Sequence, residues 1–284
     1  MNIAFATCSA FPDGAADDRP AAVLLDADFA VWDDDTVDWD AYERVVIRST
    51  WDCTDRIAEF LSWCERIGPL RLRNPPDLIA FNADKHYLAD LSVPIVPTTF
   101  LAPGEPLPRF DGEIVVKPSI SAAARDTGRF GPAAAATAQT LVDRIHGRGR
   151  TALVQPYLRS VDRQGETSLV FIAGCLSHVL TKRAILRDEG VAPIDDGSLG
   201  VAAAMLQDDL VIAGAADHAQ QALARHAIAE ISERFGVPLY ARVDLVADDS
   251  GAPLLLELEL TDPALYLAAS PGAAHGLTTA IHAS

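Results

Sequence analysis

Two alternating segments near the C-terminus decide the fold of this chain: residues 240–246, YARVDLV, and residues 255–260, LLELEL. Between them lie residues 248–252, DDSGA, a composition typical of a tight turn. Regular alternation of apolar and charged residues is the pattern of strands with one buried face. The two segments are therefore predicted to pair as an antiparallel hairpin.

The register of this hairpin gathers charged side chains. If the turn centres near residues 250 and 251, Asp244 lies opposite Glu257, and Arg242 lies opposite Glu259. The turn chemistry does not fix this register uniquely, and a slip of one residue would send the side chains to the other face. The leucines between the acids are predicted to face a core: Leu256, Leu258 and Leu260.

Facing carboxylates repel each other and need a compensating charge. A hard divalent cation with oxygen ligands supplies it, and Mg²⁺ is the natural candidate. We therefore expect Asp244, Glu257 and Glu259 to hold magnesium. The alternative is a solvated polar face on which Arg242 simply pairs with Glu259.

A second charged position is Lys117, which ends the Val-rich strand predicted at residues 113–117 and precedes Pro118. A lysine on a rigid strand suits a nucleotide phosphate, although a solvated strand end is the alternative. The loop at residues 119–131 has the backbone amides and hydroxyls to close over phosphates. It matches neither GxxxxGK[ST] nor GxGxxG.

Upstream of residue 77 the pattern is that of a small parallel α/β unit. Apolar runs at residues 3–6, 22–25 and 44–48 read as strands, and residues 57–67 have helical spacing. Thr54 or Asp52 can cap this helix, and Gly68 can end it. The tandem prolines of residues 74–76 favour a boundary there.

Two further units are predicted to follow. A helix near residues 77–91 precedes the strand at 113–117, and a strand-rich region with one long helix, ended at Gly236, begins after Arg150. The predicted division of the chain is 1–76, 77–150 and 151–284.

Composition excludes several classes of protein. The formal net charge of −17 opposes binding to nucleic acid, where Lys and Arg supply most of the affinity. No long apolar segment predicts a membrane span, and no secretory leader is seen. The four scattered cysteines fit a reducing compartment, so we expect a cytoplasmic protein. The oligomeric state stays open, a homo-oligomer included.

Several short motifs in series resemble the ATP-grasp superfamily, and its glutathione-synthetase-like branch in particular. The resemblance implies an ATP-grasp fold, in which a Rossmann-like α/β unit precedes two α+β subdomains that enclose ATP. The motifs are Asp84-Lys85, Val116–Pro118, Val154–Leu158, Gly165-Glu166, Lys182-Arg183, Arg242–Asp244 and Glu257–Glu259.

The resemblance also implies roles for individual residues. Lys85 and Lys117 would lie near the ATP phosphates, and Arg183 and Arg242 near the phosphoryl group in transfer. Asp162 stands where relatives place a ribose-binding acid. Where this chain has Glu259, the family often has Asn. The hinge that meets adenine would comprise Gln155, Pro156, Tyr157 and Leu158.

Residues 48–52 and 257–266 are similar to the D-cycloserine synthetase branch, whose members close O-ureidoserine into an isoxazolidinone ring with ATP. The resemblance implies a small amino-acid-like substrate. We expect its contacts to come from Arg48, Ser49, Trp51 and Asp52. The alternatives are that Trp51 is a core or interface aromatic residue and that Asp52 only caps a helix.

The predicted function is that of an ATP- and Mg²⁺-dependent ligase that phosphorylates a carboxylate for attack by nitrogen. One alternative is an intermolecular carboxylate–amine ligase that forms a peptide-like bond. Another is a nucleotide-binding regulatory protein that lacks catalysis.

Overall fold

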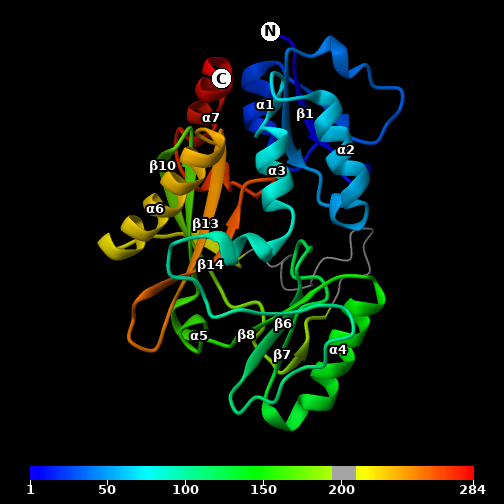
Figure 1. Cartoon of the computed structure of the whole chain (residues 1–284). Helices are drawn as coiled ribbons and strands as arrows, with labels where there is room; N and C mark the ends of the chain where they lie inside the picture. The colour runs from blue at the N-terminus through cyan, green and yellow to red at the C-terminus, as the bar shows by residue number, and fades with distance from the viewer. Residues whose placement is uncertain (194–208) are drawn as a thin grey trace.

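The N-terminal segment forms a four-stranded parallel sheet in the order β2-β1-β3-β4 (Figure 1). Strands β1 and β3 are buried along almost their whole length, which explains their continuous apolar sequences. Its elements are β1 (Ile3–Thr7), α1 (Arg19–Leu25), β2 (Asp28–Val31), η1 (Trp39–Ala41), β3 (Arg44–Ser49), η2 (Cys53–Asp55), α2 (Ile57–Ile67) and β4 (Leu72–Arg73). The computed structural model describes residues 1–193 and 209–284.

Two predictions for this unit were wrong in detail. The apolar run at residues 22–25 lies in α1 and is not a strand, because Pro20 favours a helical first turn and Asp26 ends the helix in the left-handed region. The helix at residues 57–67 is confirmed, but its N-cap is Arg56. The short helix η2 intervenes, so Thr54 does not cap α2, and the Asp52 side chain makes no capping hydrogen bond to η2.

The second sheet is antiparallel and has the order β11-β7-β6-β8-β5. Helix α4 covers it through a small apolar core that includes Val116, Leu141 and Val154. Strand β8 pairs with β6, so the predicted boundary at residue 150 separates strands of one sheet. The elements are α3 (Pro76–Asn82), η3 (Lys85–Asp90), β5 (Thr99–Leu101), β6 (Ile114–Pro118), β7 (Gly128–Phe130), η4 (Pro132–Ala134), α4 (Ala135–Gly147) and β8 (Ala152–Pro156).

The third sheet has the order β12-β10-β9-β13-β14 and holds the predicted hairpin. Helix α6 begins at a capping box formed by Asp217 and Gln220 and packs on one face. Helix α7 packs on the other face and against α1. The elements are α5 (Ser160–Gln164), β9 (Glu166–Ile172), β10 (Cys175–Lys182), β11 (Gly190–Val191), β12 (Val211–Ala213), α6 (His218–Phe235), β13 (Tyr240–Ala247), β14 (Pro253–Glu259), η6 (Leu267–Ala269) and α7 (Ala273–Ala283).

The predicted register of the hairpin is confirmed, because Asp244 pairs with Glu257 and Arg242 with Glu259. A β-bulge between Asp244 and Leu245 adds one residue to β14, and this residue is Leu256. Leu256 is therefore turned out of the core, and Leu255 is fully buried instead. The prediction that Leu256 faces a core was wrong, whereas that for Leu258 and Leu260 is confirmed.

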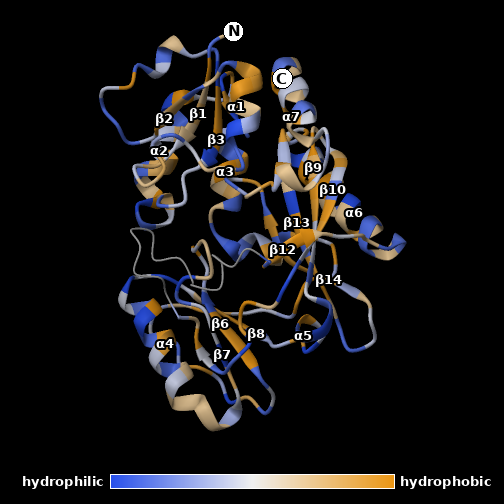
Figure 2. Ribbon diagram, turned by 180° about the vertical axis from the view of Figure 1, so that it is seen from behind, coloured by the Kyte–Doolittle hydropathy of each residue, from blue (hydrophilic) through white to orange (hydrophobic). Residues whose placement is uncertain are grey.

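The three sheets lie in different parts of the molecule (Figures 1 and 2). The second sheet lies at one end of the molecule, while the first and third sheets share the other end through α1 and α7. Figure 2 shows the strands of the third sheet mainly in hydrophobic colours. Within the described residues no helix combines the length and apolar character of a membrane span.

Candidate active site

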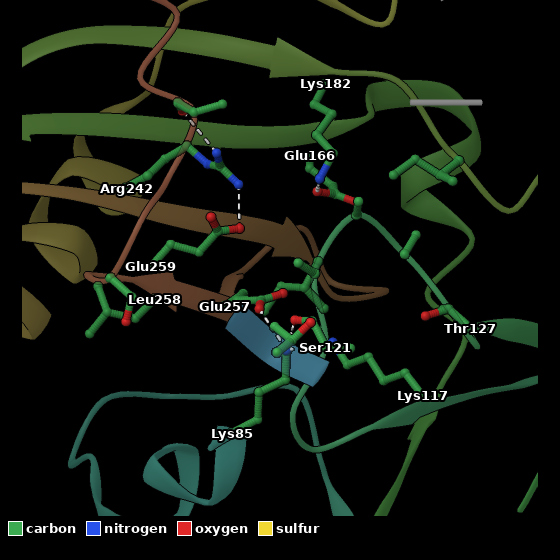
Figure 3. A pocket seen from close by; sticks show the side chains of 18 of the residues that line it. Lys85, Lys117, Ser121, Thr127, Glu166, Lys182, Arg242, Glu257, Leu258 and Glu259 are labelled. Carbon is green, nitrogen blue, oxygen red and sulfur yellow. Dashed lines mark hydrogen bonds and ion pairs between the residues drawn. The ribbon is translucent and has the colours of Figure 1, made fainter. Parts of the chain in front are cut away.

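A cavity of about 510 Å³ is lined by residues from all three sheets and their loops (Figure 3). Loops after β1 and β3 contribute Asp17 and Trp51, while β6 and β8 contribute Lys117 and Gln155. The hairpin contributes Glu257 among others. Residues distant in sequence thus share one space between structural units, where ligand sites commonly lie.

The charged face of the hairpin forms a tight network. Arg242 Nε donates to Asp244 Oδ1 at 2.9 Å, and its Nη2 donates to Asp244 Oδ2 at 3.0 Å. Nη2 also contacts Glu259 Oε1, as Figure 3 shows. Arg242 and Glu259 line the cavity, whereas Asp244 is buried behind them and does not. The alternative of a solvated face is therefore wrong, although its Arg242–Glu259 pair is present.

Two lysines predicted to meet phosphates lie beside Glu257. Lys85 Nζ is 3.1 Å from Glu257 Oε1 and donates to the Ser121 carbonyl at 3.0 Å. Lys117 is buried, and within the described chain its ammonium has no hydrogen bond or ion pair. Burial lowers the pKa of Lys117; Glu257 opposes this, and Lys85 reinforces it. A phosphate group at this position would give the Lys117 ammonium a negatively charged partner.

Lys182, rather than Arg183, reaches the cavity. Its Nζ lies 2.9 Å from Glu166 Oε2, and both side chains line the space. Arg183 pairs with Asp209 and is about half exposed outside the lining. Adjacent strand residues point to opposite faces, so only one of Lys182 and Arg183 can face inward. The motif contains both, and the sequence offered no signal for choosing Lys182.

The predicted adenine hinge lies at the apolar end of the cavity. Gln155 is buried and donates to Thr98 Oγ1 at 2.9 Å, and the Tyr157 amide donates to the Glu113 carbonyl at 2.8 Å. Pro156, the last residue of β8, lies opposite Ile114 of β6 and lines the cavity. The cavity lining here comprises Val115, Gln155, Pro156, Tyr157, Leu158, Leu186 and Leu256.

Asp162, the predicted ribose-binding acid, does not line this cavity. It accepts a hydrogen bond from the Tyr157 hydroxyl at 2.6 Å and lies 3.6 Å from Arg129. Arg129 in turn lies over the Tyr157 ring at 3.7 Å. In this arrangement Asp162 fixes the hinge tyrosine, and a contact with ribose stays a prediction.

The opposite end of the cavity is formed by the N-terminal unit and the segment after β14. Trp51 Nε1 donates to the Asp262 carbonyl at 3.2 Å. The Asp262 side chain accepts from Thr50 Oγ1 at 2.9 Å, and burial raises its pKa to about 6. Burial also raises the pKa of Asp17, whose Oδ2 is enclosed and has no hydrogen-bond partner in the described chain. These acids were not predicted, because Asp17 belongs to no motif and the resemblance of residues 257–266 assigned no role to Asp262.

Three of the four predicted substrate residues lie outside the cavity lining. Arg48 and Ser49 are buried behind it and both donate to Asp18 at 2.8 Å. Asp52 accepts from Trp32 Nε1 at 2.9 Å on the far side of the loop. Of the set, Trp51 reaches the cavity and is not a core residue, but it is also an interface aromatic, since its Nε1 donates to the distant Asp262 carbonyl. Arg48 supports the wall indirectly, since it donates to the Pro263 carbonyl at 3.0 Å.

The hairpin acids fit a hard divalent cation by chemistry and charge. Burial raises the pKa of Glu259 to about 7; Arg242 opposes the shift, and Asp244 and Glu257 add to it. Added positive charge would relieve this repulsion. In the described chain no three His, Cys, Asp or Glu side chains form a metal-binding group, because Lys85 and Arg242 occupy the acid oxygens. Magnesium would replace part of these ion pairs.

Comparison with known proteins identifies close relatives. Residues 3–74 match the family model "D-cycloserine synthetase DcsG, N-terminal domain". The cycloserine biosynthesis protein DcsG of Streptomyces lavendulae is 38% identical over 265 residues, which cover 86% of this chain and 84% of that protein. The crystal structure of D-cycloserine synthetase DcsG superposes with a TM-score of 0.87 at 34% identity, over 99% of this chain and 98% of the other.

A more distant structure shows the same fold. D-alanine–D-alanine ligase from Bacillus anthracis, complexed with ATP, has a TM-score of 0.61 at 12% identity, over 100% of this chain and 96% of that chain. The arrangement of three sheets around a shared cavity is therefore the ATP-grasp fold.

Proposed function

The chain belongs to the D-cycloserine synthetase family of ATP-grasp ligases, and from this premise we propose that it closes O-ureidoserine into the isoxazolidinone ring of cycloserine. The enzyme class itself is that of an ATP-dependent ligase that uses ATP and Mg²⁺. The proposal concerns the acceptor, the nucleophile and the residues that carry the reaction.

The cavity favours one orientation of ATP. Its apolar end, with Leu158 and Leu256, suits a purine, while Lys85, Lys117 and Lys182 gather at the charged middle. Buried lysine side chains that are not outnumbered by carboxylate partners are good partners for phosphate. We assign Lys85 and Lys117 to the ATP phosphates, and the acceptor to the end lined by Trp51 and Asp262.

In the first step a carboxylate oxygen of the acceptor attacks the γ-phosphorus, and the bond to the β,γ-bridging oxygen breaks to release ADP. Arg242, held by Asp244 and Glu259, lies beside this position and stabilises the charge on the phosphoryl oxygens. Glu257 and Glu259, with Asp244 behind them, would hold Mg²⁺, which would supply charge neutralisation of the phosphates.

In the second step a nitrogen of the same molecule attacks the acyl carbon. The acyl carbon–oxygen bond breaks, phosphate leaves, and the nitrogen loses a proton. This nitrogen also carries the carbamoyl group of the ureido function, and addition of water to that carbonyl breaks its bond to the nitrogen and releases carbamate, which leaves the cycloserine ring. Ring closure needs no second amino acid, and the observation that carries the proposal is the acceptor end of the cavity. Trp51 and Asp262 are bonded across it, and Phe11 packs edge-on against Trp51 at 5.2 Å. We also propose a cytoplasmic location, where ATP is available.

The test is mass spectrometry of the products formed from ATP, Mg²⁺ and O-ureidoserine. Release of ADP together with the five-membered ring supports cyclisation. A panel of amino acids, each with and without an added amine, is assayed in parallel. Ligation that depends on the amine, with no ring from O-ureidoserine, would show an intermolecular ligase instead. ATP binding without phosphate release from any acceptor would show a protein without catalysis.

A further inference from the structure

The loop between β6 and β7 forms one wall of the cavity. Ser121, residues 122–124 and Thr127 all line it. The Ser121 carbonyl accepts a hydrogen bond from Lys85 at 3.0 Å, which places the loop beside the proposed phosphate position. Figure 3 shows Ser121 and Thr127 on either side of Lys117. The conformation of this loop therefore decides how the phosphates are covered.

The loop has an unfavourable backbone. Ala123, Ala124 and Asp126 have φ angles of 55°, 56° and 53°. This left-handed region is disfavoured for residues with a Cβ atom, and alanine has no side-chain group that can compensate locally. Three such residues among four need contacts from outside the loop to hold them.

Helix α4 provides the first set of contacts. Asp126 is buried, with Oδ1 2.9 Å from Arg144 Nη2 and Oδ2 2.5 Å from Arg148 Nη1. Helix α4 packs on the same sheet that carries the loop. These two ion pairs therefore shape the loop within its own structural unit.

Arg125 provides a second set, and these contacts cross to the N-terminal unit. Its Nη1 donates to Asp55 Oδ2 at 2.8 Å, and its Nη2 donates to Thr54 Oγ1 at 2.6 Å. Asp55 and Thr54 lie in η2, directly after the cavity residue Trp51. Arg150 makes a second connection between the same two segments, because it donates hydrogen bonds to the carbonyls of Ile120 and Thr54. The loop between β6 and β7 is thus bonded to residues 51–55. This segment forms the wall at the acceptor end of the cavity, and we call it the acceptor wall.

We propose that Arg125 is a positioning residue, which holds the loop at residues 121–127 over the acyl phosphate by joining it to Asp55 and Thr54 of the acceptor wall. This inference rests on the proposed function of the same site. The loop so held keeps water from the intermediate. Without it, a water oxygen bonds to the acyl carbon, the acyl carbon–oxygen bond breaks, phosphate leaves and the original carboxylate is restored.

The test is the ratio of ADP released to ring product formed in the same reaction with ATP, Mg²⁺ and O-ureidoserine. In Arg125→Ala we expect product formation to fall about tenfold and the ratio to rise several-fold, because loop misplacement slows the productive attack and admits water. Arg109→Ala is the matched control, since Arg109 is 93% exposed in the same structural unit.

Asp55→Ala decides whether the contact acts through the N-terminal unit. Asp55 is about half exposed, so its removal leaves the core intact. The proposal expects the same rise in the ratio, and no further rise in the double variant. A normal ratio in Asp55→Ala beside a raised ratio in Arg125→Ala would mean that Arg125 does not act through Asp55, and the proposal would be overturned.

Failure of the function and failure of the inference are distinguishable. If the unaltered enzyme releases ADP only with another acceptor, the proposed function fails, and the ratio is measured with that acceptor. If the unaltered enzyme forms the ring and all variants keep its ratio, the function stands and the role of Arg125 is refuted.

Discussion

At the scale of single residues, Lys117 is a functional charge whose burial destabilises the folded protein. Its side chain is buried, burial lowers its pKa, and within the described chain its ammonium makes no hydrogen bond or ion pair, with Glu257 only opposing the shift from nearby. A buried charge without a partner destabilises the folded state but is available to a ligand. Stability and nucleotide binding therefore place opposite demands on this side chain.

We predict that Lys117→Met weakens ATP binding by roughly 100-fold, since one charge-assisted contact is worth about 2–3 kcal/mol. The same change is expected to leave the free energy of unfolding unchanged or to raise it, because methionine keeps the length without the charge. Calorimetric ATP titration and urea denaturation measure the two effects. Equal ATP affinity in Lys117→Met and the Arg109→Ala control would refute the phosphate assignment.

A second residue-scale prediction concerns pH. Burial raises the pKa of Asp262 to about 6, from 3.8 in the unfolded chain. Between these values the folded protein binds more protons than the unfolded one. The ionisation of Asp262 therefore lowers the free energy of unfolding as pH rises from 4 to 7. Asp262→Asn keeps the acceptor for Thr50 but does not titrate.

The variant is therefore expected to gain stability relative to the parent by about 2 kcal/mol between pH 4 and pH 7. Urea denaturation at four pH values measures this difference, and the other titrating groups cancel because both proteins share them. A difference that stays constant with pH would mean that Asp262 titrates normally in the folded protein.

At the scale of elements, the hairpin shows what alternation can and cannot predict. The charge pattern and a turn centred near residues 250 and 251 predicted Asp244 opposite Glu257, and the structure confirms this register, which the turn chemistry did not fix uniquely. The bulge was not predictable, because an extra residue in β14 leaves the alternation of residues 257–260 intact. Similarly, periodicity located α2 but could not reveal that η2 precedes it.

The bulge yields a prediction that compares two leucines of one strand. Leu258 is 1% exposed in the core, so Leu258→Ala is expected to cost about 2–5 kcal/mol of stability. Leu256 and Leu258 both line the cavity, but Leu256 is only partly buried, so Leu256→Ala should cost less stability and weaken ATP binding by roughly tenfold through lost apolar contact. Urea denaturation and ATP titration of both variants are the measurements. The reverse ranking in either assay would contradict this account of β14.

At the scale of the whole molecule, the sequence predicted the fold better than the site. The order of motifs spans most of the chain, so it indicated the ATP-grasp fold although no single motif is specific. Residues 48–52 also share one motif, yet Trp51 lines the cavity while Arg48 and Asp52 do not. That choice depends on how the loop after β3 meets Asp18 and Asp262, and these contacts join segments far apart in sequence.

Because ATP would lie between the second and third sheets, its binding should stabilise the whole molecule. At a ligand concentration 100 times the dissociation constant, MgATP is expected to raise the free energy of unfolding by about 3 kcal/mol. Removing the metal with a chelator should eliminate most of this gain, since phosphate charge would then face Glu257 and Glu259 directly.

The double variant Glu257→Gln/Glu259→Gln isolates the metal contribution. Glutamine preserves side-chain size and the acceptor oxygen for Lys85 and Arg242, but removes the charge that Mg²⁺ requires. We expect ATP to stabilise this variant equally with and without Mg²⁺, as measured by thermal unfolding at the same ATP concentration. If Mg²⁺ still added stability to the variant, the metal would be held elsewhere, and these two carboxylates would serve Lys85 and Arg242 as ion-pair partners alone.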